Sequence, residues 1–287
     1  MPKSGTWYCH YFFHILSNLR RGNAQIPARP REGVLSLPEL GLSQFLICHA
    51  ECPAFDHCDK GLQGNWSQLQ YHTDGYNWAA PLFQLNPTLN PAINPSAKLA
   101  YLVRNPLDQA VSFFDHSLKH KDRTVMAKRL PNGQLKADAS GNTWQPESPR
   151  EFFFSHNWES YLKQYLSWKH SAAKYPQQIL VVSYAKLVRN PEQVFGEILD
   201  FFEIDRNATA FGEHFSTTLQ LSSKDNLQKL ESQMGQALGR DQTDPNSRHI
   251  RDGKVAKWRR HFDENDFERM TELFGSWGVE TNEFVFE

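Results

Sequence analysis

The chain has few of the features that mark membrane proteins, secreted disulfide-rich proteins or nucleic-acid-binding proteins. Four cysteines in 287 residues are too few for a disulfide scaffold. No run of about 18 apolar residues could cross a membrane, and the first residues lack the zones of a signal peptide. The formal net charge of -1 gives no support to nucleic-acid binding. We therefore expect a cytoplasmic protein with no membrane segment and no nucleic-acid partner.

The sequence also has few signs of a boundary between domains. No Gly/Ser-rich or Pro-rich linker divides the chain, and no repeat is evident. A length of 287 residues fits one large α/β domain or two small ones. The motifs described below are spread over the whole length and must converge on one site, so we interpret residues 1–287 as a single domain.

Three of the four cysteines lie close together, which raises the question of a metal site. Cys48, Cys52 and Cys58 are interspersed with His49 and His57. The spacing lacks the Cys-x-x-Cys pairs typical of structural zinc sites. Reduced thiols are the better interpretation, and we expect no metal.

The most informative segment that is present lies at the start of the chain. Pro2-Lys3-Ser4-Gly5-Thr6-Trp7 leads into an apolar, helix-like run that ends at Leu19. Gly5 allows a sharp turn, and the following amides can point together at an anion at the helix N-terminus. A Walker A loop would need two glycines at wider spacing before Gly-Lys-Ser/Thr. The segment is a different phosphate-binding loop or, taken alone, an ordinary turn.

A second element lies a hundred residues further on. Residues 98–103 are typical of a short buried strand, Asn105-Pro106 breaks it, and a helix is predicted from Leu107. Arg104 would then lie at the carboxyl end of the strand, with Ser112 two turns into the helix. Ligands of open α/β sheets bind at that edge, and a guanidinium suits a phosphate. The alternative is an ordinary strand-to-helix loop.

Together these two elements resemble the two phosphate-binding signatures of sulfotransferases, which use 3′-phosphoadenosine 5′-phosphosulfate (PAPS) as donor. Two further segments agree in type and order: the strand at 179–183 followed by Tyr184, and Arg251-Asp252-Gly253-Lys254-Val255-Ala256-Lys257-Trp258. The likeness runs nearly from end to end. It implies an α/β fold with a central parallel β-sheet flanked by helices and a P-loop-like loop at the extreme N-terminus.

The resemblance also implies a set of binding residues. Those for the 5′-phosphosulfate are Lys3, Ser4, Gly5, Thr6 and Trp7, of which Lys3 would stabilise the leaving phosphate. Those for the 3′-phosphate are Arg104, Ser112, Arg251 and Gly253. Those near adenine are Tyr184 and Ser222, although a half-buried strand tyrosine is an alternative for Tyr184. No metal or redox cofactor is implied.

The acceptor side is less defined. The attacking hydroxyl or amine must lose a proton, which calls for a base with a pKa near neutrality. His49 follows an apolar run at 44–48 that we interpret as a strand, in the place of the family's Lys-Thr-His segment but without its lysine. His57, Glu51 and a purely structural role for His49 are the alternatives. The sequence identifies neither the acceptor, a small molecule or a glycan, nor the oligomeric state.

Several positions depart from the family pattern. Asp252 replaces a lysine, so we assign it no role, and Ala256 replaces the second glycine of the late motif. Asp263-Glu264 replace the core of the family's dimerisation signature, so that dimer is not predicted. No strand precedes the phosphate loop. Because losing a buried strand would cost several kcal/mol, we expect that the chain as written is incomplete at its N-terminus rather than naturally strandless.

Two other functions stay open. The first is a non-catalytic nucleotide-binding member of the fold, which Asp252 and the missing lysine before His49 favour. The second is a P-loop kinase, which would need the Walker glycines and a strand-end aspartate for magnesium. Neither kinase feature is visible. We therefore keep the function that the resemblance implies, sulfuryl transfer from PAPS.

Other segments bear on the architecture. Residues 23–43 are predicted to be irregular, and residues 116–149 to form either a mobile lid or a solvated insertion. The helix predicted at 152–170 carries an aromatic stripe typical of core: Trp158, Tyr161, Tyr165 and Trp168. Further helices are predicted at 227–238 and 264–274.

Overall fold

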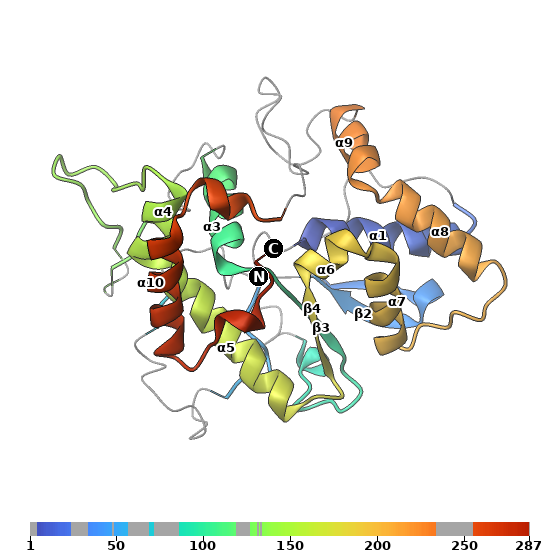
Figure 1. Cartoon of the computed structure of the whole chain (residues 1–287). Coiled ribbons are helices and arrows are strands. Elements are labelled where there is room, and N and C mark those ends of the chain that lie inside the picture. Colours follow the sequence, from blue (N-terminus) through green and yellow to red (C-terminus); the bar gives the residue numbers. More distant parts are fainter. Residues whose placement is uncertain are drawn as a thin grey trace. The chain divides into compact units, whose positions relative to one another are not determined.

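The computed structural model describes residues 5–23, 34–47, 49–56, 69–71, 86–118, 127–130, 132, 134–233 and 255–286. Its elements are drawn in Figure 1. Contacts divide the chain into two compact units. Among the described residues, the first unit contains 49–185 and 255–286, and the second contains 5–47 and 186–233. The interpretation of the chain as one domain stays a prediction.

The first unit is built on two parallel strands. β3 (Leu99–Val103) pairs with β4 (Ile179–Ser183) over its full length, from Leu99 opposite Ile179 to Val103 opposite Ser183. Parallel strands need a long crossover, and helices supply it here. These helices are α3 (Pro106–Ser117), α4 (Pro149–Phe152), a π-helix (Phe153–Asn157) and α5 (Trp158–Lys174). Both strands and their order confirm the α/β prediction.

Local sequence explains where α3 begins. The Asn105 side chain accepts a hydrogen bond from the Asp108 amide at 2.7 Å, and Pro106 occupies the first turn, where no amide donor is needed. The Asn105 amide group also donates to the carbonyl of Val285 at 3.0 Å. The predicted break at Asn105-Pro106 is therefore a helix cap tied to the C-terminal segment.

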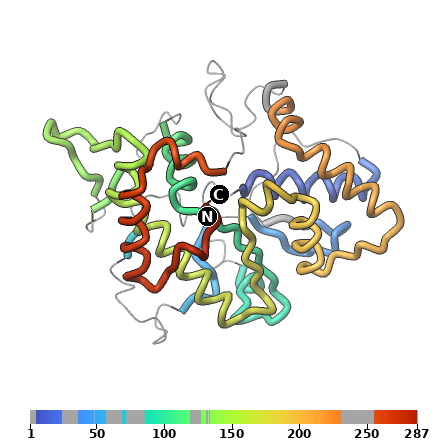
Figure 2. Tube along the Cα trace, in the orientation of Figure 1, coloured from blue at the N-terminus to red at the C-terminus, as the bar shows by residue number. Residues whose placement is uncertain are grey.

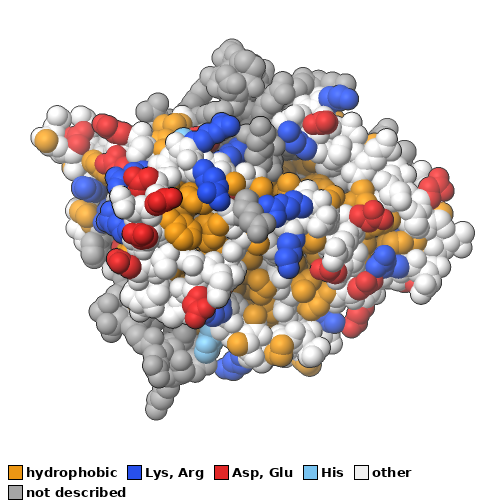
Figure 3. All heavy atoms as spheres, viewed as in Figure 1, with side chains coloured by type: hydrophobic (Ala, Val, Ile, Leu, Met, Phe, Trp, Pro, Cys, Tyr) orange, Lys and Arg blue, Asp and Glu red, His pale blue; other side chains and the backbone are white. Residues whose placement is uncertain are grey.

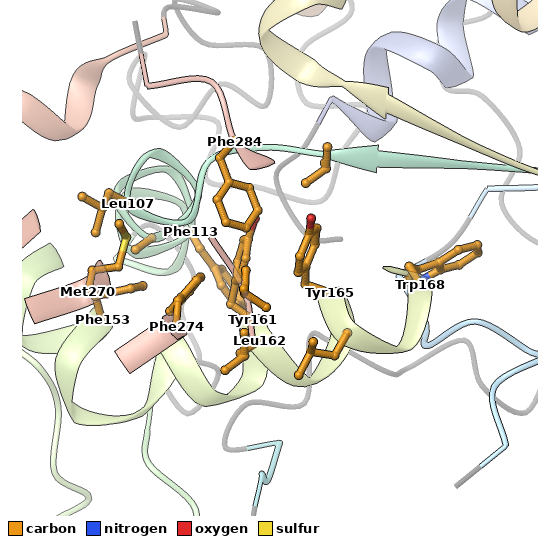
Figure 4. Packing of buried hydrophobic residues seen from close by; sticks show 14 of the residues in the cluster. Leu107, Phe113, Phe153, Tyr161, Leu162, Tyr165, Trp168, Met270, Phe274 and Phe284 are labelled. Carbon is orange, nitrogen blue, oxygen red and sulfur yellow. The ribbon is translucent and has the colours of Figure 1, made fainter. Parts of the chain in front are cut away.

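The core of the first unit is aromatic, and Figure 4 shows part of it. Tyr161, Tyr165 and Trp168 of α5 are all buried, which confirms the predicted stripe, and Trp158 packs against the same cluster. Trp168 stacks on Tyr101 of β3, with ring centroids 4.9 Å apart. This contact fixes α5 on one face of the strand pair.

The C-terminal part of the first unit closes this core. Lys257–Arg260 form a 3-10 turn, α10 runs from Glu264 to Gly275, and Thr281–Glu283 form a second 3-10 turn. Asp263 caps α10 with a reciprocal capping box, so the helix predicted at 264–274 is confirmed within one residue. Over α4 and α10, acidic and basic side chains are interspersed on the surface (Figure 3).

The second unit is mainly helical. Its helices are α1 (Thr6–Arg20), α7 (Pro191–Phe201), α8 (Phe211–Leu221) and α9 (Lys224–Gln233), with α6 (Tyr184–Arg189) beginning in the first unit. α1 packs against α8, and Phe12 stacks on Phe195 of α7 with ring centroids 3.6 Å apart. α9 overlaps the helix predicted at 227–238, whose last residues lie outside the described part of the chain.

A small hairpin in the second unit corrects one prediction. β1 (Val34–Leu37) pairs antiparallel with β2 (Leu42–Leu46) across a 3-10 turn at Pro38–Leu40. The prediction of irregular structure over 23–43 is wrong for its second half. The turn closes because Gly41 adopts a left-handed φ of 73°, a conformation that a side chain disfavours. β2 confirms a strand before His49, displaced by two residues toward the N-terminus.

The predicted lid is only partly described. Two isolated β-bridges join Arg129 to Leu135 and Ala137 to Thr143, and the Lys136 ammonium lies 4.4 Å from the Trp144 ring centroid. A lid function stays a prediction. Across the residues that the structure describes, no helix is both long and apolar enough to span a membrane.

Candidate functional site

Arg104 lies at the carboxyl end of β3, as the sequence predicts. Its side chain is buried, and its guanidinium carbon lies 4.6 Å from the Tyr184 ring centroid. Nη2 is 3.7 Å from Oδ2 of Asp108, and the backbone carbonyl accepts a hydrogen bond from the Tyr161 hydroxyl. The guanidinium is thus held by Tyr184 and Asp108, and the backbone of the same residue is held by Tyr161. A cation positioned in this way is pre-oriented, which is the property that an anion site requires.

Tyr184 directly follows β4 and is the first residue of α6. Because β3 and β4 are parallel and in register to Val103–Ser183, the residues after each strand emerge at the same edge. The tyrosine ring is buried against Arg104. Its predicted position at a strand end is confirmed, whereas contact with adenine stays a prediction.

Ser112 and Asp108 extend this edge along α3. Ser112 is partly exposed and lies four residues after Asp108, so both fall on one side of the helix. Asp108 is 1% exposed and accepts hydrogen bonds from the amides of Ala256 and Trp258. No role for Asp108 is predicted from the sequence, although an acid one turn after a phosphate-site arginine is a detectable signal. Figure 2 shows the red C-terminal segment returning beside the green α3.

His49 begins a loop that is fastened to α5. The carbonyl of the next residue, Ala50, accepts from Nε2 of Gln164 at 3.0 Å and from Nε1 of Trp168 at 2.9 Å. The Cys52 amide donates to the Ser167 hydroxyl at 3.2 Å. His49 is partly buried, and the described residues 49–56 form no strand or helix. The position of this loop is therefore set by buried polar groups of α5. The role of His49 as a base stays a prediction.

These α5 groups form a polar stripe that the sequence analysis did not single out. Four of its residues belong to α5 and the first closes the π-helix before it; they recur at three- and four-residue spacing, and all are fully buried: Asn157, Ser160, Gln164, Ser167 and Ser171. A polar face at helical spacing is normally taken as solvated. Here Ser160, Gln164 and Ser167 bond backbone groups of segments without secondary structure, at Gln70, Ala50 and Cys52. Asn157 instead donates to the Gln109 side chain of α3.

In the second unit, the predicted turn at Gly5 is confirmed. Gly5 is the N-cap of α1 with φ 94° and ψ 12°, a left-handed conformation, and no side chain caps the helix. The first turn holds no acidic residue, so no carboxylate of that turn opposes an anion at the positive end of the helix dipole. Thr6 and Trp7 lie in that turn, and the Trp7 ring lies 5.5 Å from that of His10. Lys3 and Ser4 lie outside the described residues.

Ser222 follows α8 as its C-cap and is fully buried. Its amide donates to the carbonyl of Thr218 at 2.8 Å, and its hydroxyl has no hydrogen-bond partner among the described residues. A contact with adenine stays a prediction. Arg251 and Gly253, implied for the 3′-phosphate, lie outside the described residues.

α1 also carries two neighbouring histidines, of which His10 is buried and His14 is partly buried. His10 is 4% exposed, and its ring lies 6.4 Å from that of His14. Burial, together with the neighbouring His14, lowers the pKa of His10 from 6.5 to about 4. His10 is therefore neutral at pH 7 and serves as a packing residue behind Trp7.

The structure offers no metal site in the part of the chain that it describes, where no three His, Cys, Asp or Glu side chains gather. Of the cysteine-rich segment, Cys48, His57 and Cys58 lie outside that part. Burial raises the pKa of the Cys52 thiol to about 11, so this sulfur is protonated at neutral pH and is a poor metal ligand.

Comparison with known proteins gives a family and a fold. A family model described as the sulfotransferase domain matches residues 1–281. A retinol dehydratase in complex with androsterone and inactive cofactor PAP aligns at a TM-score of 0.51 and 14% identity, covering 98% of this chain and 79% of that one. A retinol dehydratase complex with retinol and PAP gives the same TM-score and identity, covering 98% and 80%.

A mouse sulfotransferase, SULT7A1, complexed with PAP aligns at a TM-score of 0.47 and 18% identity, over 69% of this chain and 64% of that chain. The chain thus spans less than two thirds of the mouse protein's length. The curated proteins contain no significant match. At these identities the retinol dehydratase structures establish the fold, which agrees with the predicted α/β class.

Proposed function

The chain belongs to the sulfotransferase family, and on that premise we propose that it transfers the sulfuryl group of PAPS to a hydroxyl or amine of an acceptor. The observation that carries the proposal is the buried Arg104 at the carboxyl end of β3, stacked on Tyr184. Such a cation suits the 3′-phosphate that distinguishes PAPS and its product PAP from other adenine nucleotides.

For the 3′-phosphate we propose a set of residues that begins with Arg104 and Ser112. Arg104 provides charge and donors, and Ser112 adds a hydroxyl on the same helix face as Asp108. Tyr184 would lie beside the base. Arg251 and Gly253 complete the set implied by the family.

The 5′-phosphate side would come from the first residues. The turn at Gly5 and the amides at the start of α1 receive an anion without a competing carboxylate in the first turn. Lys3, with Ser4, Thr6 and Trp7, completes the loop. Lys3 supports the transfer most as the negative charge grows on the leaving phosphate.

In the reaction, an acceptor oxygen or nitrogen attacks the sulfur in line with the bridging oxygen of the 5′-phosphate. The new bond to sulfur forms, the sulfur–oxygen bond to the phosphate breaks, and its electron pair stays on PAP. The acceptor proton passes to a base, for which His49 is our choice. Positioning and charge neutralisation supply the catalysis, as in phosphoryl transfer. The leaving group is already a stable anion, and we assign to Lys3 the neutralising role that a metal ion has in phosphoryl transfer.

The acceptor class is proposed from the ligands of similar structures. Two of the similar structures contain androsterone or retinol, both small apolar alcohols. We favour a small-molecule acceptor, with glycans as the alternative. We place the reaction in the cytoplasm, which agrees with the unpaired, buried thiols of Cys9 and Cys52.

Two measurements test the function. Isothermal titration should show that PAP binds more tightly than adenosine 5′-phosphate. It should also show that ATP-magnesium is not preferred to PAP. Transfer of labelled sulfate from PAPS to a panel of phenols, alcohols and glycans should then proceed at a rate that a chelator leaves unchanged. Tight PAP binding without transfer to any acceptor would support the non-catalytic alternative. Equal binding of PAP and adenosine 5′-phosphate would refute the proposal.

A further inference from the structure

Asp108 joins two parts of the first unit that are 148 residues apart in the sequence. Its Oδ2 accepts from the Ala256 amide at 2.8 Å, and its Oδ1 accepts from the Trp258 amide at 2.9 Å. Oδ2 also lies 3.7 Å from Nη2 of Arg104. The carboxylate is 1% exposed, so these groups replace water as its partners.

The segment that Asp108 holds is conformationally unfavourable. Ala256 has φ 61° and ψ 25°, the left-handed region that a Cβ atom disfavours. A non-glycine residue stays there only when its surroundings over-determine the backbone. Hydrogen bonds from the Ala256 and Trp258 amides to one charged acceptor do so here.

The position of this clamp in the sequence connects it with the 3′-phosphate site. Asp108 lies between Arg104 and Ser112, and Ala256 follows Arg251 and Gly253 by a few residues. All four of these neighbours are residues that we assign to the 3′-phosphate.

We propose that Asp108 is a positioning residue of the 3′-phosphate site: its carboxylate, next to Arg104, holds the left-handed turn at Ala256–Trp258 against the start of α3. The assignment rests on the proposed function. The change in PAP affinity that it predicts is opposite in sign to the change expected from a purely electrostatic role of Asp108. A negative charge beside Arg104 opposes a phosphate, so charge alone predicts that removing it tightens PAP binding. A clamp predicts that removing it weakens binding.

The test is titration of full-length Asp108→Asn with PAP and with adenosine 5′-phosphate. Asparagine keeps the shape of the side chain but replaces one of the two acceptor oxygens by an NH₂ group. This group is a donor, so it cannot accept from a backbone amide. We expect PAP affinity to fall at least about tenfold, with adenosine 5′-phosphate affinity changed by less than about twofold. Asp115→Asn, on the same helix, is the matched control and should change neither. Unchanged or tighter PAP binding by Asp108→Asn overturns the clamp.

Two further variants test the left-handed backbone conformation of Ala256 directly. Adding Ala256→Gly to Asp108→Asn should recover part of the PAP affinity, because glycine adopts the turn without the clamp. Ala256→Val alone keeps Asp108 but disfavours the turn, so it should lower the preference for PAP; this variant also tests the proposal if Asp108→Asn does not fold. Full PAP preference in Ala256→Val overturns the assignment. If the unaltered protein shows no preference for PAP, the proposed function fails, and the assignment fails with it.

Discussion

The guanidinium of Arg104 lies over the ring of Tyr184, with its central carbon 4.6 Å from the ring centroid. The sequence assigns these two residues separately, one to the 3′-phosphate and the other to adenine. Their contact makes Tyr184 a support for Arg104 as well, because a buried cation–π pair fixes the plane of the guanidinium. The two assignments can therefore be tested by substitutions that separate them.

Replacing Arg104 by alanine should weaken PAP binding by about 2 kcal/mol or more, through loss of charge-assisted hydrogen bonds. Binding of adenosine 5′-phosphate should change little. Calorimetric titration measures both. Arg269→Ala is the matched control, since Arg269 is exposed and also lies over an aromatic ring, that of Phe154 at 4.2 Å. Equal losses for both nucleotides would contradict the 3′-phosphate role.

Tyr184→Phe should keep PAP affinity nearly unchanged if the ring serves mainly to orient Arg104, because the aromatic face remains. Tyr184→Ala should weaken PAP binding by about 1–2 kcal/mol, the range for a desolvated cation–π pair. The same titrations decide the matter. If the phenylalanine variant loses as much as the alanine variant, the hydroxyl carries the function and contact with adenine is the better interpretation.

Lys3 and His49 should differ in kinetic signature. Lys3→Ala should lower turnover far more than PAPS affinity, because its interaction grows as the sulfur–oxygen bond breaks. His49→Ala should leave PAP binding intact and lower turnover by about 10²–10⁴-fold, and the unaltered enzyme should slow at low pH as the imidazole protonates. Single-turnover rates across pH test both. Near-normal transfer by His49→Ala with an unchanged pH profile would make His49 structural and direct attention to His57 or Glu51.

Ala256→Gly alone should stabilise the fold. Glycine removes the penalty of about 1–2 kcal/mol for a left-handed residue but adds freedom to the unfolded chain, which leaves a net gain of about 0.5–1 kcal/mol. Denaturant unfolding measures the change. Ala172→Gly, inside α5, is the control and should destabilise by about 1 kcal/mol. A loss of stability in both variants would contradict the left-handed turn.

His10 should make stability depend on pH. Its pKa of about 4 in the folded protein lies below the usual 6.5, so as pH falls the unfolded chain takes up the proton first. Stability present at neutral pH is then lost between about pH 6.5 and 4, by up to about 1.4 kcal/mol per pH unit. His10→Gln should flatten the loss in pH-dependent unfolding curves. The exposed His261→Gln should not, and identical curves for all three proteins would refute the assignment.

Short stretches of the sequence determine many local features of this protein. The turn at Gly5, the break at Asn105-Pro106, both strands of the parallel pair and the buried aromatic stripe of α5 are confirmed. Each depends on residues within a few positions of one another: a glycine that tolerates positive φ, a proline that fits a first helical turn, or apolar residues at helical spacing. Those local signals also carry the family resemblance.

The tertiary structure decided the rest, since it concerns contacts between distant segments. Only the parallel pairing of β3 with β4 brings Arg104 against Tyr184. Only the return of the C-terminal segment gives Asp108 its two amide donors and forces Ala256 into the left-handed region that its sequence disfavours. Gln164 and Ser167 in the polar stripe of α5 find their partners in backbone groups of the distant loop that begins at His49. Side-chain periodicity indicates a face of an element, but the partner of that face depends on how the whole chain packs.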